Sequence, residues 1–273
     1  MDKRLRIGIV GTGAIGSSLA KIIIKDFSGH AKLAGIYDID LGKARILSQK
    51  LKKTYLAVLS LDELIRKSEL IIEAASAKSS WNIAKIVLAK SKDIMIMSVG
   101  GVVDHSHELC RLASKNNSKV YIPSGAISGI DALKAAQVYR IKKVTLTTTK
   151  NPLAFKGVKY IEDKKINLRR LKKDKILFSG FASKAVKLFP QNINVAAVLS
   201  LAGIGKNKTL VKIIASPKVN KNIHEILIES KAGTIKTRTE NILHPENPKT
   251  SFLAVLSAVA MIKGILEPVR IGT

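Results

Sequence analysis

A glycine-rich turn near the N-terminus constrains the fold of this chain more than any other feature. Residues 4–10 (R-L-R-I-G-I-V) form a short β-branched apolar run, and Gly11-Thr12-Gly13-Ala14-Ile15-Gly16 follows directly. Helical periodicity begins after this turn, so the segment predicts a buried parallel strand, a tight turn and a helix. In that context Gly11, Gly13 and Gly16 indicate a turn that admits a pyrophosphate to the helix N-terminus, with Ala14 and Ile15 beside it.

An acidic residue supports the same interpretation. Asp38 stands at the end of the second predicted strand, 33–38, where a carboxylate binds the ribose 2′-hydroxyl of a dinucleotide. Lys43 and Arg45 follow about a helical turn later and offer positive charge to a 2′-phosphate. We therefore expect NAD or NADP as the cofactor.

The first half of the chain alternates between strand and helix patterns. The alternation, with short connections, predicts a doubly wound parallel sheet, so residues 1–124 are interpreted as a dinucleotide-binding Rossmann domain. Further strands are predicted at 69–75, 93–99 and 119–122, and helices at 41–51, 61–67, 81–89 and 104–114.

The second half has longer strands and predicts an α+β catalytic and substrate domain at residues 125–248. Residues 160–175 are rich in lysine and are interpreted as an exposed connection. The apolar helix expected at 250–264 lies in a C-terminal segment, 249–273, that returns to the first domain. Strands are predicted at 143–149, 209–215, 223–229 and 234–240, the last two as a hairpin, with helices at 130–138, 182–188 and 196–201.

Composition narrows the class of protein. With 273 residues the chain is long enough for about two domains. The net charge of +27 is spread along the whole chain, aromatic residues make up only 4%, and no nucleic-acid-binding motif accompanies them. We interpret the lysines as residues on solvent-exposed faces, and we expect no specific nucleic-acid partner. The absence of a long apolar run or a signal-peptide pattern predicts a cytoplasmic protein without membrane contact.

Candidate chemistry comes from histidine and cysteine. His224 lies in a predicted strand (N-I-H-E-I-L-I), where inward polar residues would line an interdomain cleft, and His244 lies in a Pro-flanked segment. His105 and His107 open a helix and are interpreted as solvated, so no metal site is expected. Cys110, the single cysteine, is placed on the apolar face of a helix, which argues against the accessible nucleophile of a semialdehyde dehydrogenase.

Taken together, these segments resemble the L-aspartate dehydrogenase family. The matching stretches run in order over nearly the whole chain, and P-S-G-A-I-S-G and E-N-P-K-T-S distinguish this family from other dehydrogenases. Two departures are mild: Gly101, where alanine is common, and the high lysine content. The stretches are G-T-G-A-I-G (11–16), I-I-E-A-A-S (71–76), M-S-V-G-G (97–101), P-S-G-A-I-S-G-I-D-A-L (123–133), F-P-Q-N-I-N-V-A-A (189–197), N-I-H-E-I (222–226) and E-N-P-K-T-S (246–251).

The resemblance implies oxidative deamination of L-aspartate to oxaloacetate and ammonia through iminoaspartate. Iminoaspartate would then pass to quinolinate synthase in NAD biosynthesis. The family's catalytic histidine falls on His224, which makes His244 incidental. The remaining contacts that we expect are Ala75, Ser76, Ala126 and Asn192 for the cofactor, and Lys249, Thr250 and Ser251 for the substrate carboxylates.

Alternative functions stay open at this point. One is a related two-domain reductase acting on homoserine or dihydrodipicolinate, although the histidine-rich motif usual in dihydrodipicolinate reductases is not found. Another is a non-catalytic protein that senses NAD and binds nucleic acid through its basic surface. For the enzyme, a homodimer is expected.

Overall fold

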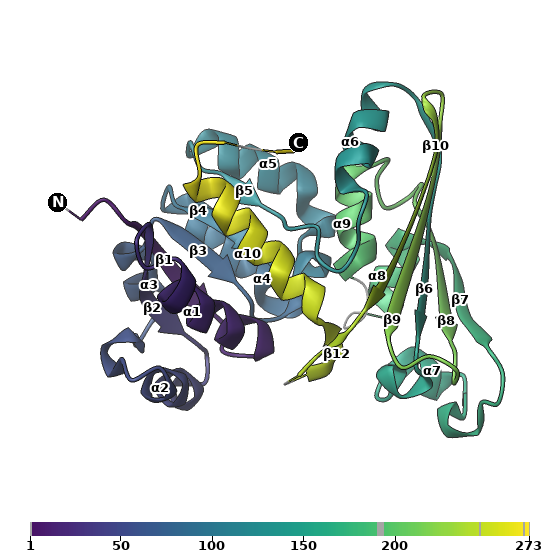
Figure 1. The fold of residues 1–273 in the computed structure, drawn as a ribbon, viewed down its shortest axis with the longest axis horizontal. Coiled ribbons are helices and arrows are strands. Elements are labelled where there is room, and N and C mark those ends of the chain that lie inside the picture. The colour runs from purple at the N-terminus through teal and green to yellow at the C-terminus, as the bar shows by residue number, and fades with distance from the viewer. Residues whose placement is uncertain (1, 190–193, 246, 270, 273) are drawn as a thin grey trace. The chain divides into compact units, whose positions relative to one another are not determined.

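The computed structural model describes residues 2–189, 194–245, 247–269 and 271–272, without the side chains of Pro248 and Lys249. Over these residues the chain divides into two compact units (Figure 1). The first unit comprises Met1–Pro123 and Val255–Arg270, and the second comprises Ser124–Ala254 and Ile271–Thr273.

The first unit is built on a parallel sheet in the order β2-β1-β3-β4-β5. The strand β3 (L-I-I-E) and most of β1 are buried, as expected for a parallel strand covered on both faces. This topology confirms the predicted doubly wound sheet. Its strands are β1 (Leu5–Val10), β2 (Ala31–Tyr37), β3 (Leu70–Glu73), β4 (Asp93–Ile96) and β5 (Val120–Tyr121).

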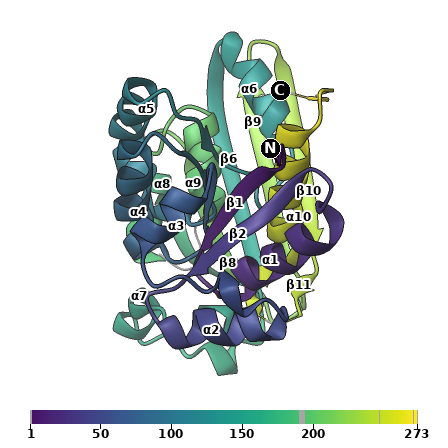
Figure 2. The same cartoon turned by 90° about the vertical axis from the view of Figure 1, so that its left-hand side faces the viewer.

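Helices cover both faces of this sheet (Figure 2). The chain leaves β1 toward β2 and then returns past β1 to β3, so right-handed crossovers place the helix before this reversal and the helices after it on opposite faces. One face carries α1 (Ala14–Asp26) and α10 (Phe252–Leu266), and the other carries α3 (Leu61–Lys67), α4 (Ala77–Ala89) and α5 (Ser106–Lys115). The helix α2 (Leu41–Lys50) follows β2. The C-terminal helix thus packs in the first unit, as expected.

The second unit is built on a mixed sheet in the order β10-β9-β6-β8-β7, which confirms the α+β expectation. Only the β6–β8 pairing is parallel among the pairings in this sheet's described residues. The strands are β6 (Ile141–Lys150), β7 (Lys175–Phe181), β8 (Leu210–Ala215), β9 (Asn222–Ser230) and β10 (Gly233–Asn241). The helices α6 (Ile130–Val138), α8 (Ala182–Leu188) and α9 (Asn194–Ala202) lie along one face (Figure 1).

One strand of this sheet was not predicted. The strand β7 lies at the edge of the sheet, and its register shifts between Ile176 and Phe178, which breaks the alternation that marks a strand. The lysine-rich segment before it, expected to be only a connection, contains α7 (Lys159–Asp163) and a 3₁₀ turn at Leu168–Arg170. A small ladder of β11 (Leu243–His244) and β12 (Asn247–Ser251) was also not predicted.

The expectation for Cys110 was wrong. The residue is exposed on α5, while its neighbour Leu109 is the buried residue of that helix. The apolar stripe of α5 is narrow, and Cys110 falls outside it. Burial therefore does not exclude a reactive thiol at this position.

In the part of the chain that the structure describes, no helix is long and apolar enough to cross a bilayer.

Candidate functional site

The glycine-rich turn connects β1 to α1 with backbone that other residues would not tolerate. Gly11 has a φ of +97°, and a Cβ there would lie 2.5 Å from the carbonyl oxygen of Ala74. A Cβ on Gly16 would overlap the carbonyl oxygen of Gly11. These two glycines are therefore required by the fold of the turn itself.

Gly13 differs from its two neighbours. It is the N-cap of α1, no side chain caps this helix, and a Cβ on Gly13 would meet nothing within 4 Å. Ala14 and Ile15, the first residues of α1, are only partly buried. An uncapped helix N-terminus with open space over it fits the pyrophosphate of NAD or NADP.

Asp38, directly after β2, is held beside this turn. Its Oδ2 accepts hydrogen bonds from the backbone N–H of Thr12 at 2.9 Å and from the Thr12 hydroxyl at 2.8 Å. Burial acts to raise the pKa of Asp38, but the hydrogen bonds from Thr12 and from the N–H of Asp40 outweigh it and lower the pKa. The residue is thus a fixed anion at the position where a ribose hydroxyl would be bound.

The loop after β3 brings Ala75 to the same place, because the backbone N of Ala75 lies against the position of a Cβ on Gly11. Ser76 is the N-cap of α4, and its hydroxyl lies 2.9 Å from that of Ser79.

A buried acid that the sequence analysis did not single out holds this loop. Glu73 is fully buried, and its Oε1 accepts from the N–H of Ala75 at 2.9 Å. Its Oε2 accepts from the N–H of Ser98 and from the hydroxyl of Ser80, both at 3.0 Å. Burial raises its pKa, and these hydrogen bonds oppose the rise. The signal in the sequence that could have identified Glu73 is a carboxylate at the end of an otherwise apolar strand.

His224 lies on the helix-covered face of the second sheet, where β9 pairs with β6. Its direct partner across the strands is Thr148, whose hydroxyl oxygen lies 3.0 Å from Nδ1 of the imidazole. The residue is only 2% exposed. Burial, followed by the charge of Lys150, lowers the pKa of His224 to about 3, so the imidazole is neutral near pH 7.

Lys150 is a residue of this face that the sequence analysis missed. It ends β6, two positions after Thr148, and is 5% exposed. Burial lowers its pKa to about 8. Its signal in the sequence is the alternation of β6, which places Val144, Leu146, Thr148 and Lys150 on the buried face.

Ala126 lies near His224 through the neighbouring strand. Its carbonyl oxygen accepts from the Thr239 hydroxyl at 3.1 Å and from the Asn241 amide at 3.0 Å. Thr239 is the partner of His224 in the β9–β10 register. Thr239 thus links Ala126, which the resemblance predicts as a cofactor contact, to the candidate catalytic residue His224.

The predicted substrate residues are placed less completely. Ser251 is 5% exposed, and its hydroxyl accepts from the amide of Asn222, two positions before His224. The hydroxyl of Thr250 accepts from the amide of Asn247 at 3.2 Å. Asn192 and the side chain of Lys249 lie outside the described residues.

The other candidate histidine has a packing role. His244 is 3% exposed in β11, not in a loop, and its ring contacts Phe252 edge to face with 5.6 Å between centroids. His105 is stacked on Trp81 at 4.4 Å. Among the described residues, no group of three His, Cys, Asp or Glu side chains is arranged to hold a metal ion.

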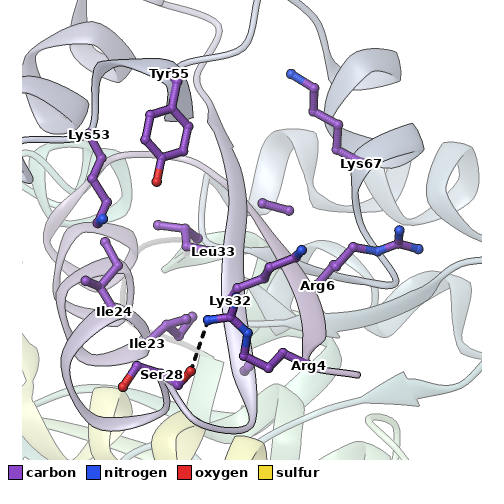
Figure 3. A pocket seen from close by; sticks show the side chains of 12 residues that line it. Arg4, Arg6, Ile23, Ile24, Ser28, Lys32, Leu33, Lys53, Tyr55 and Lys67 are labelled. Carbon is purple, nitrogen blue, oxygen red and sulfur yellow. Dashed lines mark hydrogen bonds between the residues drawn. The ribbon is translucent and has the colours of Figure 1, made fainter. Parts of the chain in front are cut away.

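A separate hollow of about 680 Å³ lies at the amino ends of β1 and β2 (Figure 3). Its lining includes Arg4, Arg6, Lys32, Lys53 and Lys67. Most of these cations are paired: Arg4 and Lys32 with Asp2, Arg6 with Glu69, and Lys67 with Glu63. Ligands of open parallel sheets bind at the opposite, carboxyl ends of the strands, where the glycine-rich turn lies. The hollow is therefore not the dinucleotide site.

Family models match both halves of the chain. The model described as "Aspartate dehydrogenase, C-terminal" matches residues 131–265. The model described as "Homoserine dehydrogenase, NAD binding domain" matches residues 11–123. The second match covers the glycine-rich turn, Asp38 and Ala75, and the first covers His224 and Lys150.

Curated relatives and solved structures agree with these matches. An L-aspartate dehydrogenase of Methanosarcina barkeri is 44% identical over 98% of this chain and 100% of its own length, and one of Methanosarcina acetivorans is 45% identical over the same shares. The crystal structure of aspartate dehydrogenase from Thermotoga maritima is 26% identical, with a TM-score of 0.74 over 98% of this chain and 100% of that one. A hyperthermophilic archaeal homoserine dehydrogenase, 14% identical over 98% of this chain and 100% of its own with a TM-score of 0.59, shows the shared fold alone.

The helix N-terminus without a side-chain cap, the fixed Asp38 and the buried His224 are thus found in a chain whose two curated relatives named above are both L-aspartate dehydrogenases. This protein is an oxidoreductase with NAD or NADP as its cofactor, and it belongs to the L-aspartate dehydrogenase family.

Proposed function

We propose that the protein oxidises L-aspartate to iminoaspartate, which water converts to oxaloacetate and ammonia, and that His224 holds the proton of the substrate amine. The observation that carries this proposal is the hydrogen bond between His224 and Thr148 on the buried face that Lys150 and Asn222 share. When bound, NAD or NADP supplies the acceptor for the hydride that leaves the α-carbon.

The first requirement of the reaction is a neutral amine. An ammonium group has no lone pair to form the C=N bond as the hydride leaves, so a base must take one of its protons first. A neutral imidazole suits this role, and His224 is neutral near pH 7. For Nε2 to accept that proton, Nδ1–H has to donate to the hydroxyl oxygen of Thr148.

The same imidazole then assists hydrolysis. Loss of the hydride leaves the protonated imine, and His224 releases the amine proton to solvent. Water then adds to the imine carbon as His224 takes one of its protons. His224 passes this proton to the nitrogen, and ammonia leaves as the C–N bond breaks, while the hydroxyl proton is lost to solvent and the carbonyl group of oxaloacetate forms. Because His224 is 2% exposed, side chains that cover it have to move before the substrate makes contact.

The substrate carboxylates require donors. We propose Ser251, which the Asn222 amide holds beside the His224 strand, together with Thr250 and Lys249 of the same segment. Ala75, Ser76, Ala126 and Asn192 are proposed as cofactor contacts. The hand-off of iminoaspartate to quinolinate synthase and the homodimer stay predictions from the sequence.

The test is the initial rate of NADH and NADPH formation with L-aspartate at alkaline pH. D-Aspartate, L-glutamate and L-homoserine serve as controls, and borohydride added during turnover reduces released imine to a mixture that contains D-aspartate. We expect NAD(P)H to form with L-aspartate and with none of the control substrates. We also expect D-aspartate to appear only when borohydride is added. Oxidation of L-homoserine in its place would assign the protein to the related reductases.

A variant assigns the base. His224→Ala should lower turnover by roughly 10²- to 10⁴-fold while the affinity for NADH stays unchanged. His30→Ala, an exposed histidine in a turn of the first unit, is the matched control. Wild-type turnover in His224→Ala would end the assignment.

A further inference from the structure

Lys150 shares a surface with His224 that the strand register defines. Thr148 is directly opposite His224, and Thr149 is opposite Ile223, so the next position of β6 brings Lys150 level with Asn222. Directly opposite residues of an antiparallel pair point to the same face. Lys150 and His224 are therefore diagonal neighbours on the buried face, roughly 7–8 Å apart by typical strand geometry.

The charged residues of the neighbouring hairpin are on the other face. Glu225 alternates with His224 along β9, and its carboxylate pairs with Arg238 at 2.8 Å. Arg238 also pairs with Glu240 at 2.8 Å, and both are exposed. The face that holds His224 instead presents the cation of Lys150 and neutral polar groups from Thr148, Asn222 and Ser251.

A cation and amide or hydroxyl donors around a base are the groups that a dicarboxylic amino acid requires. On the basis of the proposed function, we propose that Lys150 binds a carboxylate of the substrate beside His224. Lys150 thereby selects for an acidic amino acid.

This pairing also explains how a histidine with a strongly lowered pKa becomes a base. The charge of Lys150 contributes to the low pKa of His224. A carboxylate bound to Lys150 offsets that charge, so the pKa of His224 rises when the substrate is present. Burial lowers the pKa of Lys150 to about 8, and the bound carboxylate opposes this by favouring the charged form of the lysine.

The experiment replaces the cation by a side chain of similar length. Lys150→Met should raise the KM for L-aspartate by about 10- to 100-fold while NADH binding, followed by fluorescence, stays unchanged. It should also move the acidic limb of the kcat/KM profile to higher pH, because a positive neighbour of His224 is lost. Lys143→Met, on the opposite and exposed face of β6, is the control and should match the wild type.

Direct binding separates this proposal from the reaction. Succinate, a dicarboxylate without an amine, should bind the wild-type protein in the presence of NADH, and its affinity should fall as the pH rises above about 8. This wild-type measurement needs neither turnover nor a folded variant.

The outcomes are distinguishable. Succinate affinity that does not change with pH, or a wild-type KM in a folded Lys150→Met protein, would overturn the role of Lys150 and leave the reaction in place. Wild-type protein that binds succinate through Lys150 but does not oxidise L-aspartate would overturn the proposed function instead. A structural role alone would not move the acidic limb of the pH profile.

Discussion

The hydroxyl oxygen of Thr148 lies 3.0 Å from Nδ1 of His224 on the buried face where β6 pairs with β9. This contact holds the ring of a histidine that burial keeps neutral, and it leaves Nε2 as the nitrogen for the proposed proton transfer. The pair forms because two strands far apart in the sequence place the residues directly opposite each other. In the proposed reaction, Thr148 is therefore a positioning residue for His224.

Thr148→Val should lower kcat for L-aspartate by about tenfold, because valine keeps the shape of threonine but cannot accept a hydrogen bond from Nδ1–H. Leaving the buried Nδ1–H without its partner costs about 1–3 kcal/mol. The affinity for NADH should stay unchanged. Thr147→Val, on the opposite face of β6, is the control, and equal kcat values in the two variants would contradict the role of Thr148.

The low pKa of His224 predicts a specific loss of stability in acid. Between about pH 3 and 6.5 the unfolded chain binds a proton at this residue and the folded protein does not, so stability falls as the pH falls through that window. The slope contributed is about 1.4 kcal/mol for each pH unit. Urea unfolding at pH 7 and pH 4.5 should show a smaller loss for His224→Asn than for the wild type. Identical losses would show that the folded histidine titrates normally.

Substitutions at two glycines of the turn should affect different properties, Gly13→Ala the binding of NADH and Gly16→Ala the stability of the fold. Gly13→Ala should keep the unfolding temperature but weaken NADH binding about tenfold or more, since its Cβ meets no protein atom and projects where a pyrophosphate approaches. Gly16→Ala should lower the unfolding temperature, because its Cβ overlaps the backbone of Gly11. Calorimetry and fluorescence titration measure the two effects, and loss of stability in Gly13→Ala would contradict this division.

Sequence patterns predicted the first unit more completely than the second for a physical reason. Its parallel strands are short apolar runs, and the turn between β1 and α1 carries glycines that its geometry requires. The edge strand β7 was missed because a register shift and two half-exposed apolar residues, Ile176 and Phe181, obscure its alternation. Edge strands are less strongly marked because one side of them meets no partner strand.

The candidate site was predicted only where a motif marked it. His224 and Asp38 were identified from their positions at strands, whereas Lys150 and Glu73 were not, because lysine and glutamate are usually exposed. Their burial depends on which face of a strand is covered, and that is decided by tertiary pairing. The position of Cys110 was predicted incorrectly because the buried stripe of α5 is narrow and contains Leu109 but not Cys110.

Asp38 should control the choice between the two cofactors. Its fixed anion repels a 2′-phosphate, so Asp38→Ser should raise the ratio of kcat/KM for NADP to that for NAD by about tenfold or more. Asp40→Ser is the control, because serine still caps α2 and the Asp38 carboxylate stays in place. A ratio that is unchanged in Asp38→Ser would place the ribose elsewhere.

Glu73 should affect the affinity for the cofactor indirectly, because it holds Ala75, which is a proposed cofactor contact. Its two oxygens accept from the N–H groups of Ala75 and Ser98 and from the Ser80 hydroxyl. In Glu73→Gln the new amide group replaces an acceptor with a donor, so one of these buried donors loses its partner at a cost of about 1–3 kcal/mol.

We expect a lower unfolding temperature for Glu73→Gln and, because Ala75 is a proposed cofactor contact, an NADH dissociation constant raised about tenfold. Glu69→Gln, exposed just before β3, is the matched control for the loss of a carboxylate in this region. A variant that loses stability but binds NADH with wild-type affinity would show that the loop after β3 does not position the cofactor.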